Sequence, residues 1–152
     1  MKRLVSLLIG LVVLVVMSTG VGAEGKSELA EARKGTAKYH NVQKAIDDGY
    51  LPTDEFVSVP GLGVMGYHYV NPGLVDGEVD ASSPEVLLYV PMKNGDVQLV
   101  GVEYLSTSED SSLFGQQFDP PGAVEEYSLH VWIWKHNPNG MFAHFNPSIK
   151  VY

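Results

Sequence analysis

The sequence contains no cysteine and few basic residues. The absence of cysteine excludes disulfide bonds, thiolate metal ligands and a cysteine nucleophile. Ten Lys and Arg stand against 18 Asp and Glu, so the formal net charge of the 152 residues is −8. Nucleic-acid-binding proteins present basic patches, so we expect no nucleic-acid partner. Because 45% of residues are hydrophobic and only 18% are charged, the composition excludes a disordered chain and predicts one folded domain.

Motifs that would assign a catalytic mechanism are also missing. The segment Gly61–Gly66 has the glycine spacing of a dinucleotide-binding fingerprint, but a strand-like sequence follows it where that motif requires a helix. We therefore interpret it as a glycine-rich turn and expect no nucleotide cofactor. There is no phosphate-binding loop, zinc-protease helix, nucleophile elbow or calcium-binding loop. Catalytic residues cannot be assigned from motifs.

The first 23 residues have the layout of a secretory signal. Lys2 and Arg3 precede an apolar run of 14 residues, Leu4–Met17, and Val21–Ala23 resembles a cleavage site. A membrane-spanning helix needs about 20 apolar residues. We therefore predict a signal peptide over 1–23 and a single mature domain over 24–152, secreted or in the cell envelope, with no stable membrane span after cleavage. Retention of the segment as an anchor is the alternative.

The pattern after the signal segment predicts a helix and then a change of architecture. From Glu28 to Asp48 there is no proline, and apolar or small residues recur at helical spacing. Ser27 is a candidate N-cap and Gly49 a candidate C-cap. Gly35 either splits the helix or marks close packing. All nine prolines come later, which places the change near residue 51.

The remaining sequence predicts β-strands. Alternating, β-branched and aromatic stretches cover Phe56–Val59, Val64–Val70, Val86–Val90, Val97–Leu105 and Tyr127–Trp134. Asn94 and Gly95 predict a tight hairpin that pairs Lys93 with Asp96 and Val90 with Leu99. The same register places Glu103 opposite Val86, with Glu85 pointing to the other face.

These elements predict an α+β fold. We expect an N-terminal helix packed on a curved antiparallel β-sheet of four to six strands, either open or barrel-like. Both faces of the hairpin are apolar, so a second layer should cover the face away from the helix. Two long connections, Pro72–Pro84 and Ser106–Ala123, join the strands. Because the second contains Leu113, Phe114 and Phe118, it either docks on the fold as a lid or is a plain surface loop.

The histidines are the best candidates for a functional site. His68 and His130 each lie in the middle of a predicted strand. Alternation places His130 on the same face as Trp132 and Trp134, an aromatic and imidazole composition that is common in ligand pockets. His144 lies in a turn-rich segment after the last strand, which could fold back over this face. His40, on the shoulder of the helix, is expected to be structural, at the seam between helix and sheet.

Two imidazoles, a third from a loop and one carboxylate would make a mononuclear metal site. We assign His68, Glu103, His130 and His144 as candidate ligands and, without cysteine, zinc, copper(II), iron(II) or manganese as candidate ions. The expected pocket wall consists of Tyr67, Trp132, Trp134 and His136. The alternative is that the two strand histidines are hydrogen-bonded within the core and that the other two lie on the surface.

Several blocks together resemble a family of small exported bacterial proteins of uncharacterised function. The blocks are Ala37–His40, Asp48–Tyr50, Met65–Pro72, Pro84–Tyr89, Val102–Tyr104 and His130–Phe142. The resemblance implies export and a single domain, and it implies nothing about chemistry.

Three functions remain open at this stage. The first is an exported acidic binding protein whose His/aromatic pocket takes a small ligand or a divalent metal. The second is a cupin-like enzyme that uses the same residues as metal ligands or as general acid and base. The third is a structural or interaction protein that uses the aromatic face as an interface.

Overall fold

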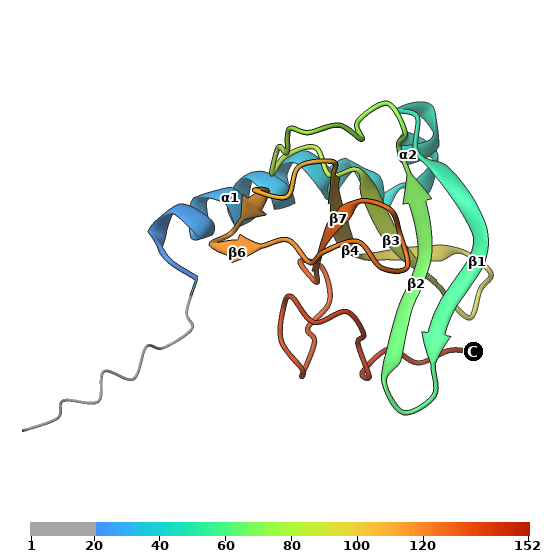
Figure 1. The fold of residues 1–152 in the computed structure, drawn as a ribbon. Coiled ribbons are helices and arrows are strands. Elements are labelled where there is room, and N and C mark those ends of the chain that lie inside the picture. The colour runs from blue at the N-terminus through green and yellow to red at the C-terminus, as the bar shows by residue number, and fades with distance from the viewer. Residues whose placement is uncertain (1–20) are drawn as a thin grey trace, which may run out of the picture.

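The computed structural model describes residues 21–152, which form the expected α+β fold (Figure 1). A helical segment lies across one face of a five-stranded antiparallel sheet that curls into a half-barrel. The predicted signal peptide falls almost entirely in residues 1–20, outside the described residues. Within residues 21–152, none of the helices has the length and apolar character needed to cross a membrane.

The helical segment consists of α1 (Ala23–Thr36), the 3-10 turn η1 (Ala37–His40) and α2 (Val42–Asp47). The predicted cap at Ser27 is wrong, because α1 begins four residues earlier, after Gly22. The extra turn packs against the second long connection, since a Cβ atom at Gly25 would lie 3.0 Å from the carbonyl oxygen of Phe114. Next to this turn, the Glu28 carboxylate accepts a hydrogen bond from the backbone N–H of Phe114. After η1 the chain begins a separate helix, α2, with Asn41 as its N-cap. The side chain of Asn41 accepts a hydrogen bond from the backbone N–H of Gln43.

Gly35 marks a close approach, and the predicted helix also divides just after it, because α1 ends at Thr36. A Cβ atom at this position would lie 2.1 Å from the carbonyl oxygen of Ser82. The first long connection therefore passes directly over α1. The end of α2 agrees with the sequence prediction, because Gly49 follows it with φ of 98°, a left-handed conformation that favours glycine.

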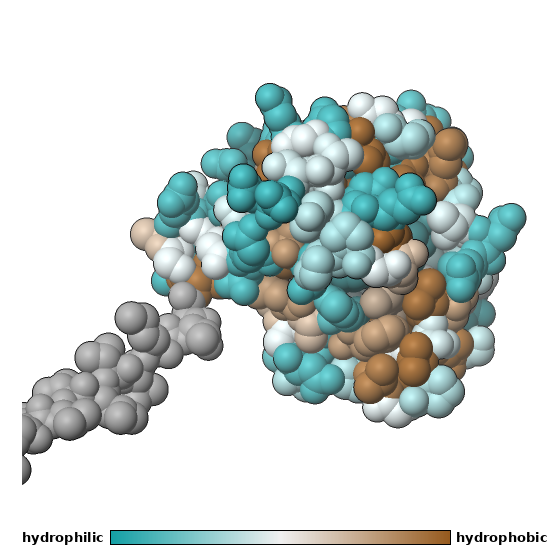
Figure 2. Space-filling model, in the orientation of Figure 1, coloured by the Kyte–Doolittle hydropathy of each residue, from teal (hydrophilic) through white to brown (hydrophobic). Residues whose placement is uncertain are grey.

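The sheet is formed by β1 (Leu51–Val59), β2 (Gly63–Val70), β3 (Val86–Pro91), β4 (Val97–Ser106) and β7 (Tyr127–Val131). Their spatial order follows the chain, β1-β2-β3-β4-β7, with every neighbouring pair antiparallel. Only Gly61 and Leu62 of the glycine-rich segment lie in the β1–β2 turn, and Gly63–Gly66 already belong to β2. Val59 and Leu62 at this turn are exposed, and Figure 2 shows hydrophobic surface at the corresponding end of the molecule.

The predicted register of the β3–β4 hairpin is wrong near the turn and right farther away. The turn holds three residues, Lys93 to Gly95, because Met92 N–H bonds to Asp96 O and Gly95 has φ of 89°. Val90 therefore pairs with Gln98 and not with Leu99. A bulge beyond Leu88 shifts the register back by one residue, so that Val86 does face Glu103.

The sheet has two buried faces. The helix-side cluster packs against the helical segment and contains Leu29, Ala32, Tyr39, Leu87, Tyr89, Leu99, Val102, Tyr104, Leu129 and Val131, among others. The opposite-face cluster contains Val64, Val86, Leu88, Val90, Val100, Leu105 and Trp132. Leu99, paired with Tyr89, lies in the helix-side cluster, and Val100 lies in the opposite-face cluster.

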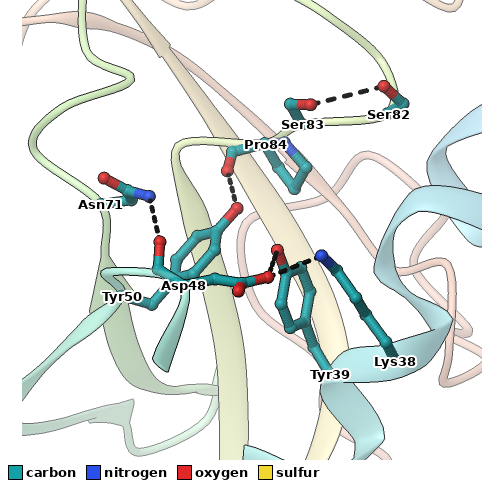
Figure 3. Close-up of polar contacts among 8 residues, drawn as sticks. All are labelled: Lys38, Tyr39, Asp48, Tyr50, Asn71, Ser82, Ser83 and Pro84. Carbon is teal, nitrogen blue, oxygen red and sulfur yellow. Dashed lines mark hydrogen bonds and ion pairs between the residues drawn. The ribbon is translucent and has the colours of Figure 1, made fainter. Parts of the chain in front are cut away.

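Polar contacts tie the end of the helical segment to the sheet (Figure 3). The Tyr50 hydroxyl donates to the carbonyl of Pro84 at 2.6 Å, and the Tyr39 hydroxyl donates to the Asp48 carboxylate at 2.9 Å. Asn71, just after β2, donates to the carbonyl of Asp48 at 3.1 Å. These bonds connect the end of α2 to the end of β2 and to the segment just before β3.

The second long connection docks on the core. It forms a small hairpin of β5 (Ser112–Leu113) and β6 (Gln116–Gln117). Leu113, Phe114 and Phe118 are all buried in the helix-side cluster. The interpretation as a plain surface loop is therefore wrong.

The C-terminal segment after β7 supplies the second layer. It begins beside β7, where Trp132 N–H bonds to Met141 O at 2.8 Å. It then reaches β2, where Asn146 forms an antiparallel bridge with Val64. Ile149 packs against the opposite-face cluster. This segment of the same chain therefore covers part of the face away from the helices, for which a second layer was predicted.

Candidate metal centre

Three neighbouring strands bring His68, Glu103 and His130 together on the face opposite the helices. Glu103 of β4 pairs directly with His130 of β7. His68 of β2 pairs with Leu88, which in turn pairs with Gly101, two residues from Glu103 on the same strand. Residues two apart in a strand share a face. The sheet register itself therefore positions all three side chains.

The distances among these groups suit a single ion. His68 Nε2 lies 3.5 Å from Glu103 Oε2, and His130 Nε2 lies 3.5 Å from Glu103 Oε1. The three residues each offer a ligand atom, and these atoms lie within 4.8 Å of one another. Ligands about 2.1 Å from a tetrahedral ion are about 3.4 Å apart. The nitrogen–oxygen separations are close to this edge length.

Burial changes the protonation of the group. Glu103 is 4% exposed, and burial, helped by the charges of Glu126 and Glu85, raises its pKa to about 8. His130 is 5% exposed, and burial, helped by the neighbouring His68 and His144, lowers its pKa to about 3. Burial also lowers the pKa of His68. At neutral pH the metal-free group therefore holds two neutral imidazoles and one carboxylic acid.

His130 lacks the hydrogen bonds that a buried imidazole needs. Neither Nδ1 nor Nε2 has a partner, although both atoms are shielded from solvent. A buried polar atom without a hydrogen bond costs about 1–3 kcal/mol. The interpretation of His130 as a hydrogen-bonded core histidine is therefore wrong. An imidazole nitrogen that faces a carboxylate without bonding to it is available as a ligand.

The fourth predicted ligand, His144, lies beside this group and outside it. Its ring centroid is 5.3 Å from that of His130. Its Nε2 is 2.8 Å from Asp119 Oδ2, in an exposed hydrogen-bond contact. Sequence reasoning missed Asp119, because it lies in the long connection and only the backbone bridge from Asp119 to Ser128 of β7 brings it here.

The expected pocket residues separate on the two faces of the sheet. Trp132 lies on the face of the metal group and donates from Nε1 to the carbonyl of Ala143 at 2.6 Å. Tyr67 precedes His68 and pairs with Tyr89 of the helix-side cluster, so it lies on the other face. It does not line the metal group. Its ring packs on that of Phe56, with the two ring centroids 5.1 Å apart.

Trp134 does not share a face with His130, contrary to the prediction. It packs on the helix-side cluster, where its Nε1 donates a hydrogen bond to Thr36 Oγ1 at 3.1 Å. The centroid of its ring lies 4.4 Å from that of the His40 ring. Strand β7 ends at Val131, and a bond from Ile133 N–H to Val131 O interrupts the alternation. The placement of His40 at the seam agrees with its predicted structural role.

His136 and Glu85 also lie apart from the group. His136 is exposed, and its carbonyl accepts from Asn146 and Ser148. Glu85 is buried, but its carboxylate accepts a hydrogen bond from Leu105 N–H at 3.0 Å. Burial raises the pKa of Glu85 to about 7. It is a second buried carboxyl group, and one of its oxygens is bonded to a backbone N–H.

Access to the group is narrow. The side chain of His68 is the most exposed of the three, at 18%. A surface pocket of about 470 Å³ lies elsewhere, between the β3–β4 turn and the C-terminal end, and none of the three residues lines it. The arrangement suits an ion.

Comparisons with known proteins found no match: no family model, no curated protein and no solved structure is similar to this chain at a significant level.

Proposed function

We propose that the protein is an exported metal-binding protein and that His68, Glu103 and His130 ligate one divalent transition-metal ion. The observation that carries the proposal is the buried imidazole of His130, which has two unpartnered nitrogens and faces a carboxylate and a second imidazole. Such a group is costly in a folded protein unless something binds it. A metal ion bound to Nε2 removes part of this cost.

The donor set supports a transition-metal ion above calcium or magnesium, and zinc is the ion used in the tests below. Two imidazoles and one carboxylate suit zinc, copper(II), iron(II) and manganese, whereas calcium and magnesium prefer oxygen ligands alone. Three protein ligands leave one position of a tetrahedral zinc ion for water or a further ligand. His144 remains the predicted fourth ligand, since its ring already contacts that of His130.

Export is part of the proposal because of the layout of the first 23 residues. A short positive start, a 14-residue apolar run and a small-residue site support it. The absence of cysteine suits a metal site outside the cytoplasm, because imidazole and carboxylate ligands are not lost by oxidation to disulfides.

A zinc titration of the protein without a histidine tag tests the metal site. Isothermal titration calorimetry at pH 7.5 should show one zinc ion per chain. His130→Gln and His68→Gln should each weaken binding by at least about 100-fold, because each removes a ligand. His136→Gln is the matched control, since its exposed ring is not part of the group. Equal affinity in all four proteins, or no zinc binding by the unmodified protein, would refute the proposal.

A further inference from the structure

The basic residues of the β-rich part of the chain are concentrated in one place. Residues 48–152 contain three Lys, no Arg and 14 Asp or Glu. The three lysines are Lys93, Lys135 and Lys150, which come from three separate parts of the sequence. All three line the surface pocket of about 470 Å³. None of the 14 acidic residues lines it.

The fold brings the three lysines together from distinct elements. Lys93 lies in the β3–β4 turn, Lys135 follows β7, and Lys150 lies near the C-terminal end. Lys93 Nζ lies 4.6 Å from the centre of the Tyr152 ring, a cation–π contact that holds the terminal segment over the turn. Figure 1 shows the C-terminal end beside this hairpin. Asp96, the residue after the turn, accepts a hydrogen bond from the side-chain amide of Asn94 at 2.7 Å.

The rest of the pocket supplies an apolar floor and neutral polar groups. The floor is made by Val90, Pro91, Met92, Val100 and Ile149. Gln98 and Ser148 add neutral hydrogen-bonding groups, and the ring of Tyr152 adds an aromatic wall. The volume falls within the range of about 300–1,000 Å³ that is typical of small-molecule sites.

We infer that this pocket binds a small organic anion, with a phosphate or carboxylate group at the three lysines and an apolar body on the floor. Lysine ammonium groups bind such anions as point charges and do not require bidentate geometry. In a protein with a net charge of −8, only a local excess of positive charge attracts an anion. The inference is independent of the metal group, none of whose residues lines this pocket.

The test uses 1-naphthyl phosphate, with 1-naphthol as its neutral counterpart. Metal is first removed from the protein with EDTA, which is then dialysed away because it is itself a carboxylate anion, and calorimetry is performed in metal-free buffer. The pocket variant carries Lys93→Gln, Lys135→Gln and Lys150→Gln. The control carries Lys26→Gln, Lys34→Gln and Lys44→Gln, which remove the same charge from exposed positions of α1 and α2. Circular dichroism verifies that both variants are folded.

We expect saturable binding of 1-naphthyl phosphate with one site per chain and clearly weaker binding of 1-naphthol. The pocket variant should lose at least about tenfold in affinity, and the control should stay within about twofold of the unmodified protein. Affinity should also fall with added salt. Equal losses in both variants, no loss in the pocket variant, or no binding at about 1 mM phosphate ester would overturn the inference.

Discussion

Glu103 is the residue whose chemistry depends most on its surroundings. It is paired with His130 across the β4–β7 ladder and lies almost entirely out of contact with solvent. Its pKa of about 8 means that it holds a proton at neutral pH in the metal-free protein. A carboxylic acid is a poor metal ligand, so an ion must displace that proton in order to bind. Metal binding and proton release are thus coupled at one side chain.

This coupling predicts how zinc affinity depends on pH. Below its pKa Glu103 is protonated, and each unit of falling pH should weaken binding about tenfold. Between pH 6.5 and 8 the two histidines contribute little to the pH dependence of zinc affinity, because burial lowers the pKa of both below the usual value of 6.5. We therefore expect affinity to rise across this range, with about one proton released per zinc bound at pH 7. Calorimetry in buffers of different ionisation enthalpy measures the release.

Two carboxyl variants separate the role of Glu103 from a general effect of buried acids. Glu103→Gln should abolish both the proton release and most of the affinity. Glu85→Gln is the matched control, because Glu85 is also buried with a raised pKa but its oxygen is bonded to a backbone N–H. Zinc binding that is independent of pH, or equally impaired in the two variants, would contradict the assignment.

His68 and His130 could be predicted from the sequence because each lies in the middle of a β-branched and aromatic stretch that is typical of a strand. The pairing of Glu103 with Val86 was predicted correctly although the register near the hairpin turn was not. The face of Trp134 could not be predicted in this way. Strand β7 ends before it, so side chains no longer alternate between the two faces of the sheet. The partners of His144 and of the pocket lysines are set by long-range packing, for which the local sequence carries no signal.

At the level of elements, α1 depends on the missing side chain at Gly35. The helix packs against the first long connection so closely that the Ser82 carbonyl occupies the space of a Cβ atom. The sequence could suggest that Gly35 is special, but only the structure shows that the reason is packing.

Gly35→Ala should destabilise the protein by about 1–3 kcal/mol in urea unfolding, because α1 must move away from Ser82. Helix propensity alone predicts the opposite, since alanine in a helix is favoured over glycine by about 1 kcal/mol. Gly122→Ala is the control, because this exposed glycine has no atom closer than 4.0 Å to a Cβ there and its φ is not positive. A stabilised Gly35→Ala protein would show that α1 is not held against this loop.

The β3–β4 hairpin shows why pattern alone gives an incomplete register. Asn94 and Gly95 indicate a turn, yet they fit both a two-residue and a three-residue loop. The protein uses the longer loop, and the bulge between Leu88 and Tyr89 restores the pairing that Glu103 needs. Two opposite errors in the predicted register therefore cancel at the metal group.

At the scale of the whole molecule, the two faces of the sheet have different roles. The helical segment and the β5–β6 hairpin bury the helix-side cluster, which holds most of the core. The C-terminal segment crosses toward β2 on the other side and brings His144 against His130. The sequence could predict the class of fold and the need for a second layer. It could not show that the layer comes from the same chain.

X-ray absorption spectroscopy of the zinc-loaded protein tests the central claim most directly. The account predicts a first shell of nitrogen and oxygen at about 2.0–2.2 Å, with the outer-shell scattering of two or three imidazoles that His130→Gln reduces by one. A first shell of oxygen alone, or a spectrum that His130→Gln leaves unchanged, would show that zinc binds elsewhere and would contradict the account.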